Sequence, residues 1–332
     1  MRFFITGATG FIGTELIHFL HKKNHTIRVF CRPTSKTDVF GHIPVEISYG
    51  NICDFHSIKK AIKGCDYVIH LAGYAKNWAK NPQIFYDVNL QGLDNLLKAA
   101  QEERIKKALI ISTCMVFGPS NKNPVNENIN QIENHLCEYQ HSKCEADKLG
   151  LSANQDGLPV VIVHPTRVFG PGLLTEGNSV TIMIEKYLQG KWRYILSDGT
   201  AVGNYVYIDD VVQGIWKAFE RGKPGEKYIL GGENLSYNEF FDTVRQISKC
   251  RRFMFHTPAW TAMGIARIQL LLAYVFKKYP LITPKWIRIF LMNWAFSSDK
   301  AQKELGYTIT PFKQGIDKTI KWLRSGQAKN RG

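Results

Sequence analysis

A tyrosine and a lysine four residues apart are the side chains in this sequence best suited to proton transfer. Tyr139 and Lys143 lie in a segment with helical spacing, so both side chains project from one helix face. An ammonium group beside a phenol favours the phenolate and lowers the tyrosine pKa. Such a phenol can pass a proton to or from a substrate oxygen. Because this spacing occurs often by chance, the pair needs support from elsewhere in the chain.

Thr113 gives that support. It follows the apolar run 108–112, which is typical of a buried strand. In open α/β sheets, ligands bind beyond the carboxyl ends of the strands. The Thr113 hydroxyl could therefore hydrogen-bond the same substrate oxygen as Tyr139. Thr113, Tyr139 and Lys143 are the candidate catalytic residues.

A glycine-rich turn near the N-terminus indicates dinucleotide binding. Thr6-Gly7-Ala8-Thr9-Gly10-Phe11-Ile12-Gly13 lies between an expected strand and an expected helix. The first glycine permits a tight turn, the second a close approach of backbone to pyrophosphate, and the third packing of helix on strand. The helix N-terminus adds free N–H groups. The expected contacts come from Gly7, Thr9, Gly10, Phe11, Ile12 and Gly13.

The residues after the second expected strand favour NADP(H). NAD enzymes usually place a carboxylate about 20 residues after the glycine turn, where it bonds the ribose 2′-hydroxyl. Here that region holds Arg32, Ser35 and Lys36 and no carboxylate. A guanidinium and a hydroxyl suit a 2′-phosphate. NAD(H) stays possible, because a solvated basic loop would leave the preference open.

Strands and helices alternate over the first half of the chain. Expected strands are 3–5, 26–31, 45–48, 66–71, 108–112 and 160–164, and expected helices are 11–22, 55–63, 82–104 and 137–154. This order predicts an α/β fold with a Rossmann-type doubly wound parallel sheet. Beyond residue 165 the alternation weakens. We expect a dinucleotide-binding domain over 1–166, with 201–222 returning to it, and a smaller C-terminal substrate-binding lobe over 167–200 and 223–325.

The composition limits the class of protein. Of 332 residues, 44% are hydrophobic and 21% are charged, which is typical of a globular chain and excludes global disorder. The net charge of +15 favours anionic partners. None of the seven cysteines forms a Cys-x-x-Cys pair, and no Cys/His cluster has zinc-ligand spacing. We expect free thiols, no metal, no signal peptide and a cytoplasmic protein.

An ordered set of motifs resembles one enzyme family. The motifs are TGATGFIG at 6–13, HLAG at 70–73, VNLQGL at 88–93, ISTCMVFG at 111–118, YQHSK at 139–143, HPTRVFGPG at 164–172 and YVYIDD at 205–210. Together they resemble the extended short-chain dehydrogenases/reductases over nearly the whole chain. VFCRPTSK at 29–36 and the stretch 294–322 are most similar to the dihydroflavonol-4-reductase-like and 3β-hydroxysteroid-dehydrogenase-like branch.

The resemblance implies roles for individual residues. Tyr139 would be the acid/base, Lys143 would lower its pKa and bond the nicotinamide ribose, and Thr113 would orient the carbonyl. The further cofactor-binding positions are Asn51 and Ile52 beside the adenine, Leu71, Ala72 and Gly73 along the cofactor, and Pro165 and Arg167 near the nicotinamide. Asn51 stands where the family usually has Asp, which weakens the adenine contact. The family also implies a homodimer through the helices near 85–104 and 137–154.

These observations favour an NADP(H)-dependent oxidoreductase that reduces the ketone or aldehyde of a lipophilic small molecule, or oxidises the alcohol. Dehydratases of the superfamily carry Asp-Glu after the Ser/Thr, whereas this chain has Cys114-Met115. The alternative is a nucleotide-sugar 4-epimerase with tightly bound NAD, in which residues 190–193 contact a diphosphate. A scaffold protein that binds the dinucleotide without turnover is the non-enzymatic alternative.

The segment 243–298 is basic and aromatic. It has no acidic residue, three tryptophans and nine basic residues, namely Arg245, Lys249, Arg251, Arg252, Arg267, Lys277, Lys278, Lys285 and Arg288. The apolar run 259–276 is shorter than a typical membrane span and contains Arg267. It is interpreted as an ordinary helix with a solvated basic face, as a pocket helix, or as a peripheral contact with an anionic membrane at the cytosolic side. No nucleic-acid recognition module accompanies the charge.

Other polar residues have structural interpretations. Asp209 and Asp210 lie at a strand-to-helix junction, where we expect them to cap the helix. His70 and His164 end expected strands, and we expect hydrogen-bonded core histidines. His141 should point away from the face of Tyr139. Cys114 borders the candidate site, where a reactive thiol is possible.

Overall fold

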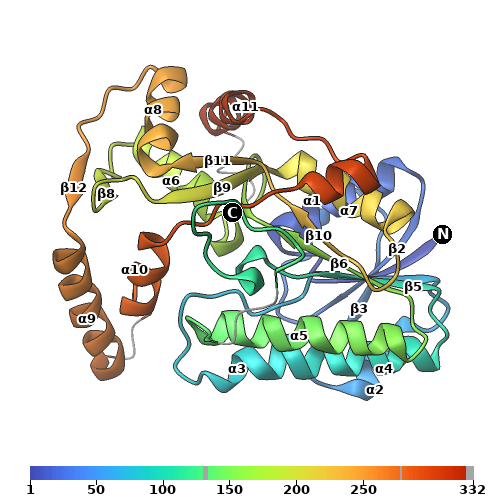
Figure 1. Cartoon of the computed structure of the whole chain (residues 1–332). Coiled ribbons are helices and arrows are strands. Elements are labelled where there is room, and N and C mark those ends of the chain that lie inside the picture. Colours follow the sequence, from blue (N-terminus) through green and yellow to red (C-terminus); the bar gives the residue numbers. More distant parts are fainter. Residues whose placement is uncertain (130–133, 277–278, 327–332) are drawn as a thin grey trace.

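A seven-stranded sheet forms the centre of the computed structural model, which describes residues 1–129, 134–276 and 279–326 (Figure 1). Its order is β10-β6-β5-β4-β1-β2-β3, and all neighbouring pairs are parallel. The strands are β1 (Arg2–Thr6), β2 (Thr26–Cys31), β3 (Glu46–Tyr49), β4 (Tyr67–His70), β5 (Lys107–Ile111), β6 (Val160–Pro165) and β10 (Lys227–Leu230). The predicted Rossmann-type fold is confirmed.

Helices cover both faces of this sheet, which makes three layers (Figure 1). One face carries α2 (Phe55–Ile62), α4 (Gly92–Glu102) and α5 (Glu138–Gln155), and the other carries α1 (Phe11–Lys22) and α7 (Ile208–Arg221). A separate apolar core lies on each side. The continuous apolar run of β6, buried along its whole length, is what a strand covered on both faces requires.

The expected helix over 82–104 contains an irregular turn. It consists of α3 (Gln83–Tyr86), the π-helical turn η2 (Asp87–Gln91) and α4. The buried Asn89 lies in that turn, accepts from the backbone N–H of Tyr74 at 2.7 Å and donates to Ser142 Oγ of α5 at 2.9 Å. The π turn thus places an amide that ties the loop after β4 to the helix of the candidate catalytic pair. Such turns are frequent at functional sites.

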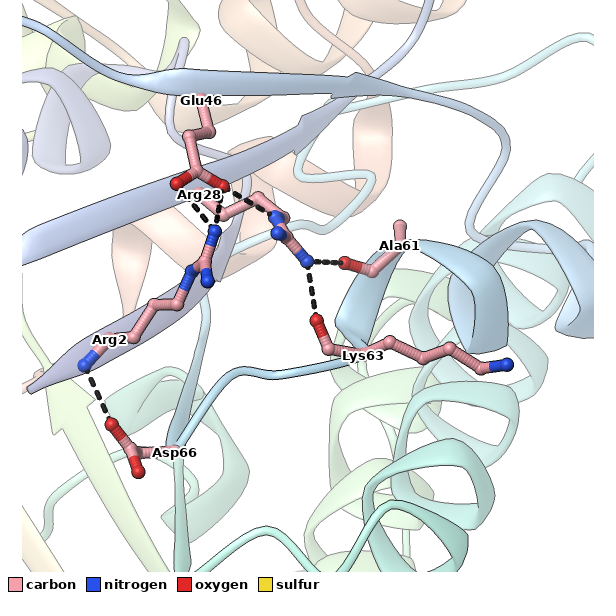
Figure 2. A network of polar contacts seen from close by, with 6 residues as sticks. All are labelled: Arg2, Arg28, Glu46, Ala61, Lys63 and Asp66. Atoms are coloured by element: carbon pink, nitrogen blue, oxygen red, sulfur yellow. Dashed lines mark hydrogen bonds and ion pairs between the residues drawn. The ribbon is translucent and has the colours of Figure 1, made fainter.

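A polar network connects β1, β2 and β3 near the amino-terminal ends of these strands (Figure 2). Glu46 of β3 accepts from Arg2 of β1 at 2.5 Å and from Arg28 of β2 at 2.9 Å. Arg28 also donates to the backbone oxygens of Ala61 and Lys63, where α2 ends. These oxygens have no partner within the helix, so the guanidinium both caps α2 and fixes it to the sheet.

The smaller lobe contains two short sheets. β7 (Arg167–Phe169) and β11 (Glu233–Ser236) flank β9 (Val202–Tyr207), and β8 (Tyr194–Leu196) pairs with β12 (Phe255–Thr257). The helices of the lobe are α6 (Ser179–Leu188), α8 (Tyr237–Ser248), α9 (Ala259–Phe276), α10 (Pro284–Leu291) and α11 (Phe312–Arg324). Elsewhere in the chain, short turns follow β2 and β5, namely η1 (Asp38–Phe40) and η3 (Cys114–Phe117), and two more are η4 (Glu176–Asn178) and η5 (Ala301–Leu305).

Two elements differ from the expected division of the chain. The sequence analysis assigns 223–325 to the lobe, but β10 pairs with β6 as the edge strand of the large sheet. It also expects 201–222 to return to the first domain. Only α7 does so, because β9 belongs to the sheet of the lobe. Both short strands depend on pairings with distant residues, which their own sequences do not specify.

The expected capping role of Asp209 and Asp210 is wrong. Both lie in the first turn of α7, whose cap residue is Tyr207, and no side chain caps the helix. Asp210 instead accepts from the backbone N–H and the hydroxyl of Thr310, each at 2.7 Å. It therefore fixes the segment that precedes α11 to the start of α7.

Candidate active site

The candidate site lies where the order of strands in the sheet reverses. The chain builds β1, β2 and β3 outward and then returns to place β4 on the other side of β1. Ligands of open α/β sheets bind at this point, beyond the carboxyl ends of the strands. A cavity of about 390 Å³ opens here. Most predicted site residues line it, namely Gly7, Gly10, Phe11, Ile12, Gly13, Leu71, Ala72, Gly73, Thr113, Tyr139, Lys143, Pro165 and Arg167.

The glycine turn has the geometry that a dinucleotide requires. Gly7 has φ +72°, and a Cβ there would lie 2.5 Å from the backbone nitrogen of Ala72. A Cβ on Gly13 would lie 2.4 Å from the carbonyl oxygen of Gly7. Gly10 begins α1, and no side chain caps the helix there. No capping side chain therefore occupies the first-turn N–H groups, which suit a pyrophosphate.

Thr113 and Tyr139 meet at the cavity wall. Thr113 begins the turn η3 directly after β5, and its hydroxyl accepts from the backbone N–H of Met115 at 3.3 Å. Loss of solvent raises the pKa of Tyr139 above its usual value, and a hydrogen bond with Thr113 opposes this rise. The phenol is therefore protonated at neutral pH. It is suited to donate a proton to a substrate oxygen.

Lys143 lies beneath this pair and is 5% exposed. Its ammonium group donates to the backbone oxygen of Ile111 at 3.0 Å, at the end of β5. Burial lowers the pKa of Lys143, and the carboxylate of Asp147 opposes the shift. The expected lowering of the Tyr139 pKa by Lys143 is not found, because burial raises this pKa and Lys143 is not among the groups that shift it. The Lys143 side chain therefore lines the cavity beside Thr113 and Tyr139.

Asp147 anchors this part of α5 to the sheet. It accepts from His164 of β6 at 2.7 Å, and both side chains are fully buried. His70 is likewise buried and hydrogen-bonds the Thr6 hydroxyl at 2.7 Å. The prediction of hydrogen-bonded core histidines at 70 and 164 is confirmed. His141 bonds the hydroxyl of Tyr86 at 2.9 Å and does not line the cavities described here, in agreement with the predicted direction.

His70 should make stability depend on pH. Burial, and next the charge of Lys143, lower its pKa to about 3, whereas histidine in an unfolded chain titrates near 6.5. The unfolded state alone therefore gains a proton below pH 6.5, so stability falls as the pH falls. Between about pH 6.5 and 5, we expect the free energy of unfolding of the wild type to fall by up to about 2 kcal/mol more than that of His70→Asn. Urea unfolding at both pH values measures this difference.

The exposed His42 provides a matched control for that measurement. His42→Asn should keep the wild-type dependence on pH, because it leaves the buried contact of His70 with Thr6 unchanged. If His70→Asn shows the same loss of stability as the wild type, the proposed exclusion of a proton from His70 is wrong.

A second cavity, of about 280 Å³, shares Tyr139 with the first. Its apolar side chains come from the loop after β4, from α3, from α9 and from α10, and include Trp78, Phe85, Leu270, Tyr274 and Trp286. The sequence analysis names none of these as site residues, although it considers 259–276 as a pocket helix. Their separation in the chain hides the pocket from a search for local motifs. The apolar wall beside the phenol suits a lipophilic substrate.

The predicted 2′-phosphate residues gather in a third cavity. It measures about 780 Å³, and Thr9, Arg32, Ser35 and Lys36 line it. Asn51 and Ile52 line none of these three described cavities. Asn51 accepts from the backbone N–H of Cys53 at 3.1 Å, and Ile52 packs against Gly92. Both shape the turn after β3.

Arg167 brings a fixed positive charge to the wall of the first cavity. It donates to the hydroxyls of Tyr237 at 3.0 Å and Tyr205 at 3.3 Å, and its guanidinium lies over both rings. These tyrosines lie in the lobe, and no sequence motif connects them with Arg167. The arginine therefore links β7 of the lobe to the candidate site.

Cys114 has no sign of activation. It is 6% exposed, and burial raises the pKa of its thiol to about 12. A thiol with this pKa stays protonated at neutral pH and is a poor nucleophile. In the part of the chain that the structure describes, no group of three or more His, Cys, Asp or Glu residues could hold a metal ion.

Comparison with known proteins identifies the relatives of the chain. The profile of the NAD dependent epimerase/dehydratase family matches residues 3–231. A "Putative dihydroflavonol 4-reductase" of Synechocystis sp. is 25% identical over 97% of this chain and 94% of its own length. The "3beta-hydroxysteroid-dehydrogenase/decarboxylase isoform 1" of Arabidopsis thaliana is 26% identical over 98% of this chain and 80% of its own length.

Solved structures share the fold over the whole chain. The crystal structure of gox2253 has a TM-score of 0.83 at 29% identity and covers 98% of this chain and 99% of that one. The UDP-glucose 4-epimerase of Thermotoga maritima has a TM-score of 0.82 at 21% identity, over 98% of this chain and 100% of its own. At that identity the epimerase likeness supports the fold alone.

Proposed function

Because this chain belongs to the NAD dependent epimerase/dehydratase family, the extended short-chain dehydrogenases/reductases, we propose that it is an NADP(H)-dependent oxidoreductase of a lipophilic carbonyl compound. It reduces a ketone or aldehyde, or oxidises the corresponding alcohol. The observation that carries the proposal is the position of Tyr139, which borders both the glycine-lined cavity and the apolar cavity. A substrate carbonyl in the apolar cavity would reach the phenol that also lines the glycine-lined cavity.

The chain's own residues provide binding, orientation and proton transfer. Gly7, Gly10 and Gly13 would hold the pyrophosphate, and Lys143 lies where the nicotinamide ribose would bind. When bound, the nicotinamide supplies the hydride for the carbonyl carbon. Thr113 donates a hydrogen bond to the carbonyl oxygen and orients it. Tyr139 gives its proton to that oxygen as negative charge develops, which is general acid catalysis.

The names of two of the relatives support an apolar substrate. The Synechocystis and Arabidopsis relatives are named for a dihydroflavonol and a hydroxysteroid, which are fused-ring compounds rather than sugar nucleotides. The aromatic and aliphatic side chains of the second cavity support the same class, and Lys76, Glu138 and Lys285 add charge to its wall. We also propose the cytoplasmic location and the homodimer through α4 and α5 that the sequence analysis expects.

The epimerase alternative has less support at the site. The sequence analysis expects residues 190–193 to contact a diphosphate, but among the described residues these four line neither cavity that Tyr139 borders. Arg193 instead donates to the backbone oxygen of Gly190 at 3.0 Å. The groups that would bind a sugar nucleotide are therefore not provided beside the phenol by this segment.

A substrate series tests the proposal. NADPH consumption is measured with aliphatic and fused-ring ketones of increasing apolar surface, and with UDP-sugars as the alternative substrates. We expect kcat/KM to rise with apolar surface and no conversion of the UDP-sugars. Conversion of a UDP-sugar to its 4-epimer without added cofactor would contradict the proposal.

Arg32 should set the preference between the two cofactors. Arg32→Ala removes the guanidinium from the cavity that also holds Ser35 and Lys36. A hydrogen bond between charged groups contributes about 1.5–3 kcal/mol, and exposure of Arg32 to solvent places the effect at the lower end. We expect the Kd for NADPH to rise about tenfold and the Kd for NADH to stay unchanged, in titrations by nicotinamide fluorescence.

Arg104→Ala serves as the control, because this arginine lies at the end of α4, outside all three described cavities. It should alter neither Kd. Equal weakening of NADPH and NADH by Arg32→Ala would show that the arginine does not recognise the 2′-phosphate.

A further inference from the structure

One helix of the lobe presents an apolar surface to solvent. In α9 the buried residues are Ala262, Ala266 and Ala273. Trp260 is 76% exposed, Leu271 64% and Ile268 60%. In the described chain, α9 is the one helix whose length and apolar composition would permit a membrane crossing. Figure 1 shows it along one end of the molecule, beyond the lobe sheets.

The exposed residues follow one face of the helix. Trp260, Ile268, Leu271 and Val275 are spaced at steps that return to the same side of an α-helix, opposite the three buried alanines. We call these four residues the α9 face. A helix that meets only water normally carries charged residues there. Here the exposed charge beside the face is Arg267 alone within α9.

Aromatic rings extend the apolar surface toward β8 and β12. Phe255 of β12 stacks near Tyr194 of β8, with ring centres 6.1 Å apart, and near Phe253, at 4.8 Å. All three side chains are more than half exposed. The chain enters α9 directly after β12. Of the three, Tyr194 carries a polar hydroxyl, and such aromatic side chains are favoured where apolar and aqueous regions meet.

The segment 243–298, which carries α9 and β12, is basic. The sequence has no carboxylate between Asp242 and Asp299. Arg251, Arg267 and Arg288 are exposed, and Lys285 pairs with Glu138 of α5. Lys277 and Lys278 lie outside the described residues. A second copy of the chain placed on the α9 face would bring these like charges together, which opposes self-association there.

We propose that the α9 face binds the surface of an anionic lipid bilayer. The helix lies in the interfacial plane, with Trp260, Ile268, Leu271 and Val275 in the acyl boundary and the arginines at the phosphates. It does not span the bilayer. Its 18 residues measure about 27 Å at 1.5 Å per residue, less than the hydrocarbon core, and Arg267 would lie near the centre.

This arrangement places the apolar cavity next to the membrane. Leu270 and Tyr274, on the flank of α9 beside the α9 face, line the cavity that Tyr139 borders. A lipophilic compound dissolved in the bilayer would thus enter beside the helix rather than from water. The membrane contact goes beyond the proposed reaction and does not depend on it.

Vesicle flotation of the full chain tests the contact. We expect the protein to float with mixed phosphatidylcholine–phosphatidylglycerol vesicles, to bind pure phosphatidylcholine much less, and to dissociate partly at high salt. The double variant Ile268→Glu/Leu271→Glu should reduce the partition coefficient at least about tenfold, because it removes two apolar side chains and adds like charge to the phosphates.

Lys60→Gln/Lys63→Gln on α2 is the matched control, since it changes the net charge by the same amount at the opposite end of the molecule in Figure 1. It should bind vesicles like the wild type. Wild-type protein that stays with the vesicles after alkaline carbonate extraction would show a spanning helix and overturn the proposal. So would equal flotation of both double variants, or an α9 variant that only dissociates a dimer in sedimentation velocity.

Discussion

Replacing Tyr139 with phenylalanine should lower kcat for carbonyl reduction by about 10²–10⁴-fold. The variant keeps the aromatic ring that lines both cavities but loses the proton that the account assigns to the substrate oxygen. Binding of NADPH should change little, because the cofactor turn is untouched. Steady-state turnover with the best ketone substrate and a fluorescence titration with NADPH separate these two effects.

Tyr86→Phe is the control for the loss of a phenol. Tyr86 lies in α3, bonds His141 and does not line the three described cavities. It should leave turnover unchanged. If Tyr139→Phe retains wild-type kcat with every accepted carbonyl compound, Tyr139 is not the acid and the proposed mechanism fails.

Gly13→Ala should weaken cofactor binding and stability together. The added Cβ would lie 2.4 Å from the carbonyl oxygen of Gly7 and 2.8 Å from Cα of Ala8, and both are backbone atoms that cannot rotate away. This clash can be relieved only if the turn that holds Gly7 and Ala8 moves away from the start of α1. Overpacking of this kind costs about 1–3 kcal/mol, so the NADPH Kd should rise about 5- to 150-fold if the turn bears the whole cost.

Gly264→Ala provides the matched comparison, because this glycine also lies within a helix and a Cβ there would have no heavy atom within 4 Å. It should leave NADPH binding unchanged and stabilise slightly through helix propensity. The two variants are compared by nucleotide titration and by urea unfolding. A Gly13→Ala protein that matches the wild type in both measurements would contradict the close approach of turn and helix.

Features that depend on short stretches of sequence could be predicted. The turn from Gly7 to Gly13 lies between a buried strand and an amphipathic helix, and all three elements are adjacent in the chain. The parallel sheet, with Thr113 beyond the carboxyl end of a strand, followed from the alternation of strands and helices. The structure places Thr113, Tyr139 and Lys143 at one cavity with the glycines.

Features that depend on distant contacts could not be predicted. The pKa of Tyr139 reflects burial by several elements, whereas the sequence suggests only the nearby Lys143. Arg167 is held by Tyr205 and Tyr237, which follow it by 38 and 70 residues. The strand β10 is short, and its position at the edge of the large sheet depends on its pairing with β6. None of these partners is specified by spacing or composition.

The nucleotide that accompanies the purified protein tests the central claim most directly. We expect any bound nucleotide to exchange freely, NADPH to bind about tenfold or more tightly than NADH, and a ketone substrate to release NADP⁺ in step with alcohol formation. These quantities follow from nucleotide analysis of the purified protein, a fluorescence titration and product analysis. Copurified NAD that resists exchange and is regenerated in each turnover would contradict the account and indicate the epimerase cycle instead.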